Sequence, residues 1–213
     1  MTDFQSARES MVNSQLRARG IIDSRVLEAM LRVPRHEFVA DDHRDAAYED
    51  HPLPIGEGQT ISQPYVVAVM LELLQLIGNE KALEVGTGSG YVTALLSHLA
   101  AQVFSVERYA DLAATAAGTL TKLGYTNVLV LTGDGSLGFA AEAPFDAILV
   151  SAAAQTIPPA LVEQLKDGGR MVIPVGPFEA QQLQFIRKIG GEPRITRLEL
   201  VRFVPLISSP EQG

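Results

Sequence analysis

A glycine-rich turn is the stretch of this chain whose residue types and spacing most clearly predict chemistry. The apolar run at residues 82–85 stops at GTGSG, residues 86–90, and a helical pattern begins at Tyr91. A strand that enters a helix through a glycine turn directs backbone N–H groups and the positive helix end at a ligand. The dinucleotide fingerprint needs glycine where this chain has Tyr91, which disfavours nicotinamide and flavin cofactors.

Two carboxylates accompany this turn. Glu84 precedes the first glycine by two residues, and Glu107 ends the apolar run 103–106, roughly 20 residues downstream, the spacing typical of a carboxylate that binds a ribose diol. The phosphate-binding signature G-x-x-x-x-G-K-[ST] is absent from the sequence. An acidic pocket of this kind predicts an adenosine ligand with positive charge, S-adenosylmethionine. The alternative is a glycine turn that only connects a strand to a helix.

The composition excludes several other classes of protein. The 213 residues carry a net charge of −8, which argues against broad binding to nucleic acid or anionic membranes. No cysteine is available for a disulfide, a thiolate metal site or a nucleophile, and the four histidines lack metal-binding spacing, so no metal is expected. Without a signal-peptide pattern or a run of about 18 apolar residues, a cytoplasmic protein is expected.

Apolar runs and helical patterns alternate after the glycine turn. Four runs are predicted as further strands: 103–106, 128–131, 145–150 and 171–175. Helices are predicted between them, at 112–123 and at 158–166, the latter ended by Gly168 and Gly169. This order predicts a parallel sheet that binds ligands at the carboxyl ends of its strands. Residues 183–189 and 195–204 predict an antiparallel hairpin at the sheet edge.

The N-terminal region predicts two helices. Residues 4–19 show a sparse helical pattern that Gly20 can end, and Asp23 can cap a second helix that stops before Pro34. Five arginines form a basic cluster in this acidic chain: Arg17, Arg19, Arg25, Arg32 and Arg35. Solvated helix faces are the favoured interpretation, with a specific site as the alternative.

Two polar residues near predicted strand or helix ends have two interpretations each. Residues 41–63 show no sustained hydrophobic period, which is typical of a functional or disordered loop. Pro64, which follows them, suits the first position of a helix. Ser62 or Gln63 therefore lies where a helix cap would be, so Ser62 is either a cap or a catalytic group. Asp134, after the strand at 128–131, either accepts a hydrogen bond from an adenine amino group or forms an Asx turn.

Several longer motifs resemble the protein-L-isoaspartate O-methyltransferase family across residues 11–206. They include the leader MVNSQLRARGIIDSRVLEAMLRVPRHEFV, GQTISQP, ALEVGTGSGY, VFSVER, GDG, FDAILVSAAAQTIPPALVEQLKDGGRMVIPVG and VRFVPL. The resemblance implies an α/β, Rossmann-like methyltransferase fold with a seven-stranded, mostly parallel sheet and an antiparallel last strand. Residues 1–63 would form N-terminal helices and a covering loop, and residues 64–213 the methyltransferase core, within one compact domain.

The same resemblance implies an activity and a set of site residues. A methyl group would pass from S-adenosylmethionine to the free α-carboxylate of an L-isoaspartyl residue in a damaged protein, leaving S-adenosylhomocysteine. The ester would close to a succinimide, whose hydrolysis regenerates some aspartate. Ser62 would be the catalytic residue. The residues implied to bind the cofactor are Thr60, Ile61, Gln63, Glu84, Gly86, Gly88, Glu107, Asp134 and Gly135.

The implied partners are isoaspartyl proteins and peptides, with no nucleic acid and no membrane, and a monomer is expected because no coiled-coil heptad is present. A small-molecule or RNA methyltransferase on the same sheet remains an alternative; it would keep the glycine turn and Glu107 but would have no reason to keep TISQP. A non-catalytic S-adenosylmethionine-binding module is the third interpretation, and it would keep the pocket and lose the acceptor site.

Overall fold

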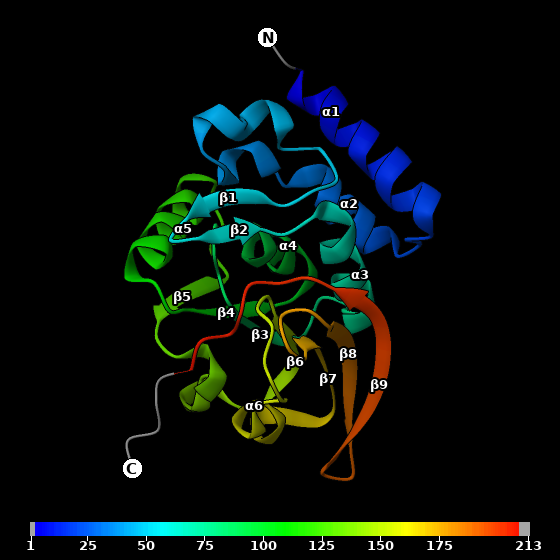
Figure 1. The fold of residues 1–213 in the computed structure, drawn as a ribbon, viewed down its shortest axis with the longest axis vertical. Helices are drawn as coiled ribbons and strands as arrows, with labels where there is room; N and C mark the ends of the chain where they lie inside the picture. Colours follow the sequence, from blue (N-terminus) through cyan, green and yellow to red (C-terminus); the bar gives the residue numbers. More distant parts are fainter. Residues whose placement is uncertain (1–2, 209–213) are drawn as a thin grey trace.

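A seven-stranded sheet forms the centre of the computed structural model, which describes residues 3–208 (Figure 1). In sheet order its strands are β5 (Val128–Thr132), β4 (Gln102–Glu107), β3 (Lys81–Val85), β6 (Phe145–Val150), β7 (Leu165–Val175), β8 (Gln181–Ile189) and β9 (Glu192–Val201). The pairings from β5 to β7 are parallel, whereas β7–β8 and β8–β9 are antiparallel. This confirms the mostly parallel sheet and the C-terminal hairpin.

Alternating residues of the central strands fill two separate hydrophobic clusters, one on each face of the sheet. In β3, Ala82 belongs to one cluster, and Leu83 and Val85 belong to the other. In β6, Leu149 belongs to the same cluster as Ala82, and Ile148 belongs to the other. Because successive side chains of a strand point to opposite faces, apolar side chains at consecutive positions are what a sheet covered on both faces requires.

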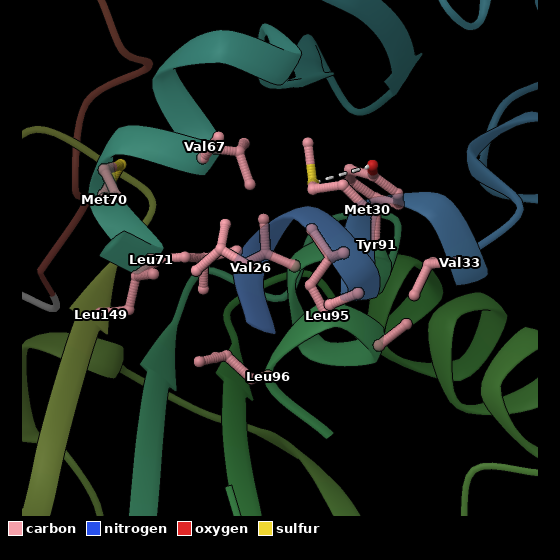
Figure 2. Packing of buried hydrophobic residues seen from close by; sticks show 14 of the residues in the cluster. Val26, Met30, Val33, Val67, Met70, Leu71, Tyr91, Leu95, Leu96 and Leu149 are labelled. Carbon is pink, nitrogen blue, oxygen red and sulfur yellow. Dashed lines mark hydrogen bonds between the residues drawn. The ribbon is translucent and has the colours of Figure 1, made fainter. Parts of the chain in front are cut away.

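Helices cover the sheet on both sides. The helices that follow the N-terminal region are α3 (Pro64–Leu74), α4 (Tyr91–Leu99), α5 (Ala110–Lys122) and α6 (Pro159–Gln164). Figure 2 shows α2 (Ser24–Arg32), α3 and α4 packed through side chains such as Val26, Leu71 and Leu95, with Leu149 of β6 beside them. The N-terminal helices therefore share one core with the sheet. No helix in the described part of the chain combines the length and apolar character needed to cross a membrane.

The N-terminal helices begin and end where the sequence predicts, with one irregularity. α1 (Phe4–Ser10) continues into a π-helical turn at Met11–Leu16 and a 3-10 turn at Arg17–Arg19. Gly20 then ends the run with φ +97°, a left-handed conformation that costs glycine little. The Asp23 carboxylate accepts hydrogen bonds from two backbone N–H groups at the start of α2, as a helix cap does.

Two predictions differ from the structure. The helix predicted at 158–166 is α6, which ends at Gln164, and the chain from Leu165 already follows β7. The stretch 41–63 is also more ordered than its lack of period suggests: it holds a 3-10 helix at Asp41–Ala46 and an antiparallel ribbon of β1 (Leu53–Gly56) and β2 (Gln59–Ile61). Short irregular elements of this kind leave no sustained period in a sequence.

Candidate functional site

A cleft opens at the carboxyl ends of β3, β4 and β6. Its walls come from β2 and the residue after it, the glycine turn, the start of α4, and the segment after β9. In Figure 1 the red segment after β9 crosses over this edge of the sheet, and the β1–β2 ribbon lies above it in the view. The cleft therefore lies at the sheet edge where the parallel topology predicts a ligand.

The glycine turn needs glycine at several positions. Gly86, Gly88 and Gly90 all have positive φ, at +89°, +52° and +89°. A Cβ atom on Gly88 would lie 3.1 Å from Cδ1 of Ile55 in β1, so the ribbon packs closely over the turn. The backbone N–H of Gly86 donates to the Val106 carbonyl at 2.8 Å and extends the register of β3 with β4 into the turn.

Glu107, at the end of β4, joins the turn to the rest of the cleft. Its Oε2 accepts a hydrogen bond from the Gly88 N–H at 2.8 Å, and its Oε1 accepts one from the Tyr109 N–H at 3.0 Å. The side chain is buried, yet it lines the cleft. Each carboxylate oxygen can accept a second hydrogen bond, so Glu107 can hold the turn and still bind a hydroxyl-bearing ligand.

Glu84 also lines the cleft, but its chemistry differs from the expected negative charge. Its Oε2 accepts hydrogen bonds from the hydroxyls of Thr93 and Ser105, whereas its Oε1 is buried without a partner among the described residues. Burial raises the pKa of Glu84 to about 8, although the two hydroxyl donors oppose the rise. Glu84 is therefore largely protonated at neutral pH.

Ser62 does not cap α3, so that interpretation is wrong. The cap residue is Gln63, which makes no side-chain capping bond, and Pro64 is the first helical residue as predicted. The Asp50 carboxylate supplies the missing acceptor from a distance: its Oδ1 accepts from the Tyr65 N–H at 3.2 Å. Ser62 therefore has no helix-capping role that would account for a serine at this position.

A broad groove adjoins the cleft on the other side of Ser62. The groove runs between the β2–α3 connection, the end of β9 and the segment that follows it. The residues that line both hollows are Thr60, Ser62, Ser151, Val204 and Pro205. Ser62 thus lies where the cleft and the groove adjoin, a position from which it can contact a ligand in either one.

The structure brings most of the predicted site residues together. Those that line the cleft are Thr60, Ile61, Ser62, Glu84, Gly86, Gly88, Glu107 and Gly135. Gln63 lines only the groove. Asp134 is not among the residues that line either hollow; its Oδ1 accepts hydrogen bonds from the N–H and hydroxyl of Ser136, which is the turn interpretation. Its adenine contact stays a prediction.

Three site features were missed by the sequence reasoning. Ser151 and Ala152, directly after β6, line the cleft, as do Val204 to Ile207. The latter segment is anchored on Ala153, whose N–H donates to the Val204 carbonyl and whose carbonyl accepts from the Leu206 N–H. The VRFVPL motif was the available signal for this segment.

The third missed feature is Arg35, which the sequence reasoning grouped with solvated arginines. It is fully buried, so the prediction of solvated helix faces is wrong for this residue. Arg17, Arg19, Arg25 and Arg32 are exposed as predicted. No set of three or more metal-binding side chains within residues 3–208 is arranged to hold an ion.

Known proteins of one family match this chain over nearly its whole length. The family model for protein-L-isoaspartate(D-aspartate) O-methyltransferase matches residues 6–211. A protein-L-isoaspartate O-methyltransferase from Koribacter versatilis is 57% identical over 209 residues, covering 98% of this chain and 94% of the relative. Another, from Syntrophobacter fumaroxidans, is 54% identical and covers 97% of each chain.

A solved structure shares the whole architecture. It is described as a β-aspartate methyltransferase of the same family from Plasmodium falciparum in complex with S-adenosyl-L-homocysteine. It superposes with a TM-score of 0.83 at 29% identity, covering 98% of this chain and 100% of the other. With a family match over nearly its full length and relatives above half identity, this chain belongs to the protein-L-isoaspartate O-methyltransferase family.

Proposed function

We propose that this chain transfers a methyl group from S-adenosylmethionine to the free α-carboxylate of L-isoaspartyl residues in damaged proteins and peptides. The observation that carries the proposal is the position of Ser62 among the residues shared by the cleft of Glu107 and the adjoining groove. A cleft for the methyl donor and a groove for a protein segment are the two sites that such a transfer needs. The family of the chain supports the same reaction.

The cleft residues fit S-adenosylmethionine. Bound there, it supplies an electrophilic methyl group on a sulfonium sulfur. The Glu107 carboxylate has acceptor capacity left for ribose hydroxyls, and the buried Oε1 of Glu84 lacks a hydrogen-bond partner among residues 3–208. Gly86 and Gly88 let the backbone approach the ligand closely, since neither has a side chain over the cleft. Thr60 and Ile61 in β2 would close the cleft from above.

The acceptor needs orientation and no general base. An α-carboxyl group has a pKa of roughly 3.3 to 3.7 and is ionised at neutral pH. The Ser62 hydroxyl would donate a hydrogen bond to one carboxylate oxygen. The other oxygen would attack the methyl carbon as its bond to sulfur breaks and S-adenosylhomocysteine leaves. Alignment of this kind can supply about 7 to 11 kcal/mol of the barrier reduction. Ser62 orients the acceptor and is not itself methylated.

The remaining repair steps need no further groups from the enzyme. In the methyl ester, the backbone nitrogen that follows attacks the ester carbonyl, methanol leaves, and a succinimide ring forms. Hydrolysis of that ring opens it on either side and returns part of the material to a normal aspartyl linkage. The partners are therefore isoaspartyl-containing proteins and peptides.

Incubation with labelled S-adenosylmethionine and a matched peptide pair tests the proposal. We expect rapid methylation of a peptide with one L-isoaspartyl residue and little methylation of its aspartyl twin, because even a shift of ~1 Å in the attacking oxygen costs much of the rate. Comparable labelling of both peptides would indicate a general carboxyl methyltransferase. Cofactor binding without labelling of either peptide would indicate a non-catalytic module, and labelling of RNA or a small molecule instead would favour the alternative methyltransferase classes.

A further inference from the structure

Arg35 is a buried cation next to the proposed active site. It begins a 3-10 helix at Arg35–Phe38, and its side chain is 0% exposed. Its Nε donates to the Ala47 carbonyl at 2.7 Å and its Nη2 to the Ser62 carbonyl at 2.8 Å. Burial lowers the pKa of Arg35 to about 10, so the guanidinium is still charged at neutral pH. A buried charge held by backbone carbonyls is costly unless its contacts are well formed.

The same guanidinium also contacts the start of the helix that follows the glycine turn. Its Cζ lies 4.9 Å from the ring centroid of Tyr91, the first residue of α4. The Tyr91 hydroxyl in turn donates to Sδ of Met30 at 3.4 Å, drawn as the dashed line in Figure 2, and Phe38 packs edge-on against its ring at 5.7 Å. Tyr91 is thereby fixed on several sides.

One side chain therefore joins the two halves of the site. On one side its Nη2 donates to the carbonyl of Ser62; on the other its Cζ lies over the ring of Tyr91, the residue after Gly90. Only a planar group with several donors can make these contacts together, since a lysine ammonium cannot both stack and form a fork. Resting on the proposed function of Ser62, we propose that Arg35 is a positioning residue that sets the distance between Ser62 and the cofactor cleft.

Arg25 provides a matched control. It too joins two backbone segments, with Nη1 donating to the Ile77 carbonyl at 2.7 Å and Nη2 to the Leu99 carbonyl at 3.5 Å. Arg25 is not among the residues that line the cleft or the groove, and its side chain is more exposed than that of Arg35. A lysine at either position removes a guanidinium that donates to two backbone carbonyls, but only at position 35 is one of those carbonyls that of Ser62.

A double-mutant cycle between Arg35→Lys and Ser62→Ala tests the inference. We expect Arg35→Lys alone to lower kcat/KM for an isoaspartyl peptide about 10-fold, because misplacement by a fraction of ~1 Å is costly to transfer. Affinity for S-adenosylhomocysteine, measured by calorimetry, should change by less than about 3-fold. In the Ser62→Ala background, Arg35→Lys should lower kcat/KM by less than about 3-fold, because the effects of substitutions at coupled residues are not additive. Arg25→Lys should leave kcat/KM unchanged.

Several results would overturn the inference. Equal losses from Arg35→Lys in both backgrounds, or an equal loss from Arg25→Lys, would indicate a general structural role. Wild-type turnover in Ser62→Ala would overturn both the inference about Arg35 and the proposed role of Ser62. Methylation of the isoaspartyl peptide by the wild-type enzyme tests the proposed reaction separately. Should Arg35→Lys fail to fold, NMR of the wild-type guanidinium replaces it: restricted rotation and slow hydrogen exchange are expected, and a freely rotating, fast-exchanging group would refute the bridge.

Discussion

The two halves of the proposed active site are built in opposite ways. The cofactor cleft consists of consecutive elements, β3, the glycine turn and α4, closed by Glu107 from the adjacent parallel strand. The acceptor side consists of the short β1–β2 ribbon and Ser62, which are held by residues distant in the sequence. Arg35 bonds the Ser62 carbonyl across 27 positions. Asp50 bonds Gln63 and Tyr65 across 13 and 15.

This difference separates chemistry shared by many proteins from chemistry specific to this one. Local contacts along a strand, turn and helix produce a nucleotide-type cleft wherever they occur. The position of an acceptor group depends on the N-terminal residues that pack over the sheet. Damage to the first half should therefore appear in cofactor affinity, and damage to the second in acceptor turnover.

The largest expected effect is on turnover at Ser62. We expect Ser62→Ala to lower kcat for an isoaspartyl peptide roughly 100-fold, as loss of a preorganised hydrogen-bond donor does. Ser62→Asp should be worse because its charge repels the acceptor carboxylate. Since Ser62 caps no helix, the free energy of unfolding of Ser62→Ala should differ from that of the wild type by less than about 0.5 kcal/mol. Ser14→Ala, an exposed serine of the N-terminal region, is the control. Wild-type turnover in Ser62→Asp would break the comparison.

The next effect is on cofactor affinity at Glu107. We expect Glu107→Ala to weaken binding of S-adenosylhomocysteine by about 1.5 to 3 kcal/mol, the contribution of hydrogen bonds to a charged acceptor. The affinity of Glu107→Gln should fall between those of the wild type and Glu107→Ala, because its amide oxygen can still accept a hydrogen bond from the Gly88 N–H. Titration calorimetry measures both. Asp111→Ala, an exposed carboxylate in the first turn of α5, should bind as the wild type does; unchanged affinity in Glu107→Ala would exclude Glu107 from the site.

A third effect, on stability and peptide affinity, is expected at Asp50. Its carboxylate accepts from the Tyr65 N–H, from the Gln63 amide and from Arg19, so it acts as the cap of α3. Asp50→Ala should lower the free energy of unfolding by about 1 to 2 kcal/mol, as loss of a cap does, and raise KM for the peptide. Asp50→Asn keeps an acceptor and should recover most of the stability in chemical denaturation. If Asp50→Ala alters only cofactor affinity, Asp50 does not serve the acceptor side.

A fourth effect, on the pH dependence of stability, is expected at Glu84. Its pKa is raised by burial to about 8, whereas the unfolded chain releases this proton near the ordinary value of 4.5. The folded state therefore binds one proton more between these values, and stability is lost as pH rises from 4.5 through 8. We expect Glu84→Gln to remove part of this loss, on the order of 1 kcal/mol per pH unit. Denaturation at pH 5, 6.5 and 8 measures it, and parallel curves for the two proteins would contradict a protonated Glu84.

Much of the cofactor half could be predicted from the sequence because its signals are local. The glycine spacing, the strand ends at Glu84 and Glu107, and the alternation of strands and helices all arise from periods and turn residues within short windows. Even so, the sequence could not reveal that Glu84 is largely protonated. That property depends on the burial of the carboxyl group between α4 and the neighbouring strand.

By itself the sequence determined the fold class, the glycine turn, the helix cap at Asp23 and, through its motifs, the family. Only the tertiary structure decided which of five arginines is buried, that Asp50 and not Ser62 caps α3, and that Ser62 lies between a cleft and a groove. The physical reason is the distance along the sequence over which each interaction acts. Hydrogen-bonded turns and hydrophobic periods act over a few residues, whereas the burial of a charge and the remote capping of a helix depend on segments that meet only after the chain has folded.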